Sequence, residues 1–276
     1  MEELISQLPA ELWSKIISFG NRNRAIPLVC RQFRQLSEYE YIPNGRDLLQ
    51  ALRIENVDML HRIARARKFD FNFNFDQTIL DKGLIVASKN GYLQIVELLL
   101  TLGADPSAYN NQAIRYASSN GHLAVVDRLL QDKRVDPSDD NNHAIIWASV
   151  YGYLSVVKRL LQDENVDPSV DNNWAIRWAS ANGHLAVIDR LLQDERVDPS
   201  DDSNDALRSA SRKGHLAVVD RLLQDKRVDP SDDNNDAIRY ACANGHLAVV
   251  KRLLQDPRVN PRGVKSFKEW LRYNHN

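Results

Sequence analysis

Cysteine is scarce in this chain of 276 residues. Cys30 and Cys242 are the only two, and neither belongs to a CxxC pair. A disulfide framework and a cysteine-based zinc site are therefore not expected, whereas a reducing compartment is. Long apolar runs are also missing. No stretch reaches the roughly 18 consecutive apolar residues that a membrane span needs, so we expect no contact with a bilayer.

An excess of charge of either sign is absent as well. The formal net charge is −1, which excludes the strongly basic profile typical of nucleic-acid binders. Residues 1–12, MEELISQLPAEL, carry acids where a secretory signal has a basic region, so an intracellular, cytoplasmic protein is expected. The segment from Lys251 onward is locally basic. A solvated helix end explains it most simply, and a docking patch is the alternative.

Catalytic signatures are the third absence. The chain contains no GxSxG, Walker A, HExxH or GxGxxG motif. Aspartate is abundant, but its placement follows the periodicity described next, so no carboxylate pair stands out. We therefore predict that the protein is not an enzyme, with no catalytic residue, no cofactor and no metal.

What the chain does have is a repeat with a period of 31 residues. The period is marked by Gly121, Gly152, Gly183, Gly214 and Gly245. Asp-Pro pairs keep the same step at 136–137, 167–168, 198–199 and 229–230. Such self-similarity predicts a solenoid, in which each unit buries its apolar face only by stacking on its neighbours.

One unit, residues 228–256, illustrates how the repeat encodes two helices. The segment DPSDDNN is typical of a turn, because Pro restricts φ and the side chains of Asp, Asn and Ser form hydrogen bonds with the nearby backbone. A short first helix follows, and Gly245 after it suits a left-handed C′ position. The apolar residues expected to face the core are Ala237, Ile238 and Ala241 in the first helix, then Leu247, Val250, Leu253 and Leu254 in the second. The predicted fold class is all-α.

The unit resembles the ankyrin repeat. The family pattern TPLHxAAxxGHxxVVxxLL is matched here by xAIRxAxxxGHLxVVxRLL. The period is shorter than the family's, which predicts a shorter turn finger, and the TPLH tetrapeptide is replaced. Its hydrogen bonds must therefore be made otherwise. Asp205 and Asp236 can cap their helices, and Asn173 is the candidate cap where Trp174 stands.

The resemblance divides the chain as follows. Residues 46–276 form the ankyrin array, with a degenerate N-terminal repeat at 46–76 and a C-terminal half-repeat cap at 261–276. Between these lie repeats at about 78–106, 107–138, 139–168, 169–200, 201–231 and 232–260.

Residues 1–42 do not follow the period. They contain Leu8, Pro9, Leu12 and Ile16, and then Leu28, Val29, Cys30 and Phe33. In these residues the segment resembles an F-box, whose family pattern has LPxELxxxI followed by LVCRxFRxL. The segment between them is shorter than usual and lacks a leucine. The resemblance implies a small helical unit that binds the Skp-type adaptor of a cullin ubiquitin ligase. The alternative is a helical cap on the solenoid.

The recurring histidines and acidic loops have structural interpretations. Histidines one repeat apart lie about 8–10 Å from each other, which is too far to share one zinc ion. The DPSDDNN loops lack the glycine and glutamate of an EF-hand. We therefore expect solvated turns and packing histidines.

The positions at which the repeats differ are the candidates for recognition. In ankyrin arrays the turn fingers and first helices line a concave binding surface. The candidate target-binding residues are Trp174, Trp178, Trp147, Tyr151, His143, Tyr116 and Arg212. Aromatic residues of this kind dominate binding energies at interfaces. The alternative is that the column of Tyr116, Trp147 and Trp178 packs between repeats, whereas Trp174 and Tyr151 are expected to be exposed.

Together these features predict a protein-binding subunit that docks a Skp–cullin ligase and holds a target protein of unknown identity. The F-box joined to ankyrin repeats resembles proteins of large DNA viruses and intracellular pathogens. The alternative function is an ankyrin scaffold or inhibitor with no ligase link. In either case we expect a monomer that binds neither nucleic acid nor membrane.

Overall fold

The computed structural model describes residues 77–260, which form twelve helices arranged in six pairs. The first helices of the pairs are α6 (Gln77–Lys89), α8 (Ala108–Ser119), α10 (Asp139–Val150), α12 (Val170–Ala181), α14 (Asp201–Lys213) and α16 (Asp232–Ala243). The second helices are α7 (Leu93–Thr101), α9 (Leu123–Leu129), α11 (Leu154–Leu160), α13 (Leu185–Leu191), α15 (Leu216–Leu222) and α17 (Leu247–Leu253).

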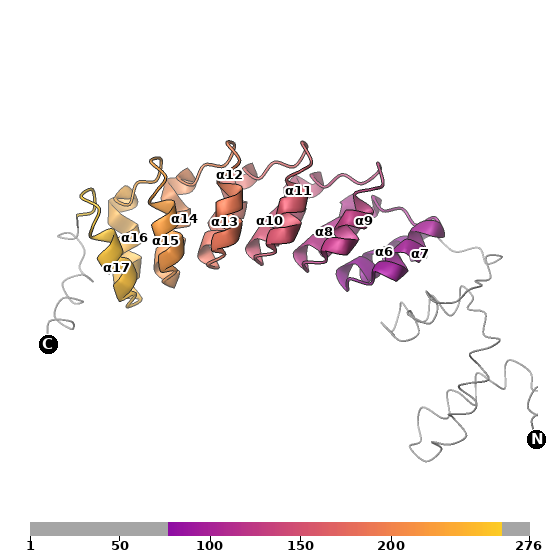
Figure 1. The fold of residues 1–276 in the computed structure, drawn as a ribbon, viewed down its shortest axis with the longest axis horizontal. Helices are drawn as coiled ribbons and strands as arrows, with labels where there is room; N and C mark the ends of the chain where they lie inside the picture. Colours follow the sequence, from indigo (N-terminus) through magenta and orange to yellow (C-terminus); the bar gives the residue numbers. More distant parts are fainter. Residues whose placement is uncertain (1–76, 261–276) are drawn as a thin grey trace, which may run out of the picture.

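The pairs stack into a gently curved array with two rows (Figure 1). Each first helix packs on the first helices before and after it, and each second helix does the same within its own row. Strands are absent from the part of the chain described. The predicted all-helical solenoid is therefore confirmed, and short helices that cannot bury an apolar stripe alone do so against their neighbours.

The core lies between the two rows. In a typical first helix the buried residues include two alanines and an isoleucine, such as Ala175, Ile176 and Ala179 in α12. The predicted face of the second helix is partly wrong. In α17 the buried residues are Val249, Val250 and Leu253, whereas Leu247 and Leu254 are exposed. The reason is geometric, because two adjacent valines and the leucine one turn on share the inward face of so short a helix.

The loops that precede α8, α10, α12, α14 and α16 form the predicted turns. The Asp Oδ1 of each Asp-Pro pair accepts hydrogen bonds from the backbone N–H and hydroxyl of the serine two residues on, as Asp198 does from Ser200. The next residues adopt a left-handed conformation in five of the six first helices described. Their φ lies between 48° and 64°, as in the triplet from Asp140 to Asn142. Asp and Asn tolerate this region better than other non-glycine residues, which explains the repeated DNN.

The third residue of each left-handed triplet is an asparagine that links neighbouring repeats. Its Oδ1 accepts a hydrogen bond from a backbone N–H of the next repeat at 2.8 to 3.0 Å, as Asn173 does from Asp198. Its Nδ2 in three repeats also donates to an aspartate of the next repeat, as from Asn173 to Asp201. The predicted cap at Asn173 is therefore wrong. The side chain joins repeats and leaves its own helix uncapped.

The glycine after each first helix is required for two reasons. The six repeated glycines have φ of 73° to 78°, which disfavours any L side chain. In addition, at five of the six the ring of the next repeat lies directly on the glycine, Gly245 being the exception. A Cβ at Gly183 would meet His215 Nδ1 at 2.8 Å, and one at Gly121 would meet Tyr153 at 2.6 Å. The His215 Nε2 lies 3.1 Å from the carbonyl oxygen of Ala181, so the histidine also closes a helix end. This contact gives the repeated histidines a packing role.

Candidate functional site

The exposed side of the first-helix row carries a cluster of aromatic rings. His143 and Trp147 of α10 and its C-cap residue Tyr151 follow one another four residues apart, so they lie on one helix face. The ring centroids of Trp147 and Tyr151 are 5.8 Å apart and the rings are stacked, whereas His143 is tilted against Trp147 at 6.0 Å. The ring of Tyr153, just beyond Gly152, extends this row, 6.2 Å from Tyr151.

The neighbouring helix α12 continues the cluster with two tryptophans. Trp174 and Trp178 are one turn apart, with ring centroids separated by 6.5 Å. The expected exposure of Trp174 is wrong, because it is partly buried against the core. Trp178 is 45% exposed, so the alternative that it packs between repeats does not hold. We define the aromatic face as His143, Trp147, Tyr151, Trp174 and Trp178.

The column that contains Trp147 and Trp178 does not stay aromatic along the whole array. Tyr116 on α8 and Tyr240 on α16 are exposed, but Ser209 on α14 is buried. Arg212 is exposed and its guanidinium carbon lies 5.6 Å from the centroid of Tyr240. Arg212 is therefore separated from the aromatic face and pairs with a different ring.

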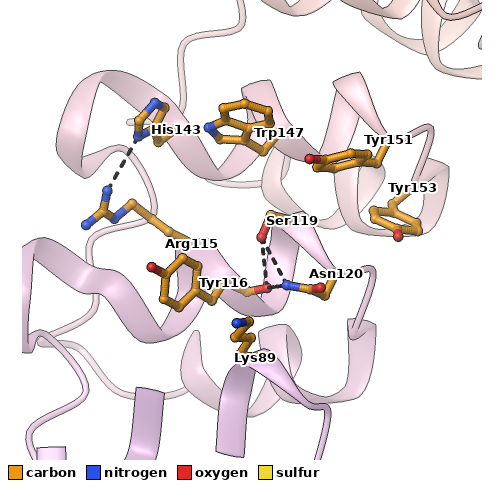
Figure 2. A pocket seen from close by; sticks show the side chains of 9 residues that line it. All are labelled: Lys89, Arg115, Tyr116, Ser119, Asn120, His143, Trp147, Tyr151 and Tyr153. Atoms are coloured by element: carbon orange, nitrogen blue, oxygen red, sulfur yellow. Dashed lines mark hydrogen bonds between the residues drawn. The ribbon is translucent and has the colours of Figure 1, made fainter. Parts of the chain in front are cut away.

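A groove of about 650 Å³ lies between α8 and α10, and it collects residues from three consecutive first helices (Figure 2). Its lining residues are Lys89, Arg115, Tyr116, Ser119, Asn120, His143, Trp147, Tyr151 and Tyr153. Figure 2 shows the rings of α10 in a row above Tyr116 of α8 and Lys89 of α6. The groove thus combines aromatic surface with two basic side chains.

Charged side chains connect α8 to the beginning of α10 beside the groove. Arg115 donates to the Asp140 carboxylate through Nη1 and to the Tyr109 carbonyl oxygen through Nη2. His143 Nδ1 lies 2.9 Å from Asp140 Oδ2. The hydrogen bond with His143, together with the Arg115 charge, lowers the pKa of Asp140 below its ordinary value. The carboxylate therefore joins the turn of one repeat to the helix of the repeat before it.

Five of the nine residues that line the groove are not in the predicted target-binding set. They are Lys89, Arg115, Ser119, Asn120 and Tyr153. The arginine recurs in other repeats, and Tyr153 stands in the histidine column, so neither stands out in the sequence. The column that contains Arg115 reads Arg115, Ile146, Arg177, Arg208 and Arg239, so Ile146 distinguishes the repeat of His143, Trp147 and Tyr151 from its neighbours.

The eight predicted adaptor-binding residues, from Leu8 to Phe33, lie outside the described residues. Between residues 77 and 260, no group of three or more His, Cys, Asp or Glu side chains is placed to hold a metal ion. Within the same range no helix is both long and apolar enough to cross a membrane. Burial raises the pKa of the Cys242 thiol to about 11, so this cysteine stays protonated at neutral pH.

Stacked helix pairs with an exposed aromatic face define a helical-repeat protein. A family model for ankyrin repeats (three copies) matches residues 84–172 and 176–262, which is more than half of the chain. The chain therefore belongs to the ankyrin-repeat family, and the matched part is a protein-binding module. The crystal structure of the human ASB11 ankyrin repeat domain is similar, with a TM-score of 0.56 at 19% identity over 65% of this chain and 85% of that one. At such identity the likeness shows the fold alone.

Proposed function

We propose that the protein is a substrate-recognition subunit, which binds a target protein on the first-helix row and a Skp-type adaptor through residues 1–42. The observation that supports binding of a target protein is the aromatic face. Trp178 and Tyr151 are 45% and 52% exposed on a rigid helical frame. Large rings held in place at a surface are the composition of binding hot spots, because they bury much area at little entropic cost.

The adaptor half is supported by sequence alone. LPxEL at 8–12 and LVCRxFRxL at 28–36 match two segments of the F-box pattern at nearly the expected separation. Ubiquitin transfer would be performed by the partner enzymes, so the chain itself needs no catalytic residue. The second candidate is a scaffold or inhibitor whose first 42 residues only cap the array.

Capture of a purified Skp adaptor by the full chain at micromolar concentration tests the adaptor half. We expect the wild type to retain the adaptor. The double variant Leu8→Ala with Pro9→Ala should lose capture, with helicity by circular dichroism unchanged. Ser6→Ala with Gln7→Ala, just before the motif, is the matched control and should bind like the wild type. Failure of the wild type to capture the adaptor would reject the ligase role and favour the scaffold.

A further inference from the structure

The groove between α8 and α10 is lined by aromatic and basic side chains and by no acidic ones. Five of its side chains offer aromatic rings, the imidazole of His143 included, and two offer positive charge, but none is a carboxylate. The nearest acid named above, Asp140, is already bonded to Arg115 and close to His143. A partner placed in this groove therefore meets apolar ring surface and positive charge, with no exposed negative charge among the lining side chains.

Lys89 is the cation of the groove that is free to meet a partner. It lies in the last turn of α6 and is exposed, with Nζ 6.0 Å from the centroid of the Tyr116 ring. No carboxylate of residues 77–260 lies within ion-pair distance of its ammonium group. Arg115 differs, because Asp140 and the Tyr109 carbonyl oxygen already occupy its guanidinium. The available charge is therefore a single ammonium at the rim of an aromatic groove.

We propose that this groove binds an exposed segment of the target protein in which an Asp or Glu side chain lies next to a bulky apolar side chain. The acid pairs with Lys89, and the apolar group packs on Tyr116, Trp147 and Tyr151. The groove volume of about 650 Å³ is in the range of sites that hold a few side chains. This inference rests on the target-binding half of the proposed function and is independent of the adaptor.

Aromatic rings can also form a cage for a methylated lysine, since their faces attract quaternary ammonium groups. Charge argues against that occupant here. A cation between these rings would lie near the ammonium group of Lys89, and like charges at such separations repel. The carboxylate of an acidic segment is attracted by the same ammonium group, which is why the proposal commits to it.

Selection of a displayed library of random dodecapeptides on the immobilised full chain tests the proposal. We expect the enriched peptides to combine Asp or Glu with Trp, Phe, Leu or Ile, and their affinity to fall as salt is added. In fluorescence anisotropy with these peptides, Lys89→Glu should weaken binding at least tenfold. Lys82→Glu is the matched control, because Lys82 is exposed on the same helix but absent from the groove. It should change affinity less than twofold.

Four outcomes would overturn the inference. They are a selection without binders, enrichment of basic peptides, preference for methylated lysine, and peptides that bind Lys89→Glu as well as the wild type. In the last case, loss of binding in Trp178→Ala would move the site to α12 and leave the target-binding function intact. Adaptor capture is measured separately through residues 1–42. A chain that selects acidic peptides but captures no adaptor would keep this inference and lose only the ligase role.

Discussion

At the scale of single residues, the repeated glycine and the ring that covers it form a close contact between repeats. Gly183 has φ of 78°, and His215 of the following repeat lies where its Cβ would be. Two costs therefore coincide at one position. The first is the left-handed backbone, which any L residue resists, and the second is the loss of room for the imidazole.

Gly183→Ala is expected to lower the free energy of unfolding by about 1–2 kcal/mol for the backbone alone, with the displaced imidazole adding to that loss. Urea unfolding followed by circular dichroism measures the change. His215→Ala supplies the control in a double-mutant cycle, because it removes the ring and leaves the backbone cost. Additive effects of the two substitutions would contradict the proposed contact, since neighbours that clash must couple.

At the scale of elements, the second helices are joined by ion pairs that run from repeat to repeat. In α11, α15 and α17 an arginine reaches an aspartate of the second helix before it, as Arg159 does to Asp127 at 2.7 Å and Arg221 to Asp189 at 2.6 Å. Arg252 pairs with Asp220 in the same way. The series is interrupted between α11 and α13. Lys158 stands at the position of the aspartate and Arg190 at that of the arginine, so the register places two like charges where these other pairs have opposite ones.

Lys158→Asp should form an ion pair with Arg190 and raise the free energy of unfolding by roughly 0.3–1 kcal/mol, the range of exposed ion pairs. The gain should shrink as salt is added, because both partners reach solvent. Thermal melts at low and high ionic strength provide the measurement. In an Arg190→Ala background the new aspartate has no partner. A stabilisation that persists there would show that the ion pair does not cause it.

At the scale of the whole molecule, the array carries aspartate–arginine pairs in its loops as well. Asp132, Asp194, Asp225 and Asp256 each accept hydrogen bonds from the arginine two residues on. These bonds lower the pKa of all four carboxyls, that of Asp132 to about 2. Because the folded pKa lies below the ordinary value of 3.8, the stabilisation is present above that pH and is lost as the pH falls toward 2.

We therefore expect the free energy of unfolding to decrease as the pH falls from about 4 to about 2, where the folded and unfolded carboxyls differ in protonation. Urea titrations at a series of pH values measure the slope. Arg134→Ala should make it shallower, because Asp132 then loses the donor that lowers its pKa. A free energy of unfolding that stays constant over this pH range would mean that the loop pairs contribute nothing.

The agreement between sequence and structure follows the range of the interactions involved. The turn at each Asp-Pro pair and the glycine after each first helix were predictable, because the residues that determine them lie within one repeat. The burial of Trp174 and Trp178 was not, although both stand on the same helix. Their exposure depends on what the adjacent repeats place beside them, and one repeat cannot specify this.

The sequence by itself determined the period, the pairing of two short helices and the all-helical solenoid, because turn propensities and apolar spacing act over a few residues and recur every 31. Only the tertiary structure decided which side chains form a surface. Lys89, Tyr116 and Trp147 come from three different helices, each roughly one repeat apart along the chain, and stacking brings them to one groove. The asparagine links and the ring on each glycine likewise exist only between repeats, since each needs a partner that the neighbouring unit supplies.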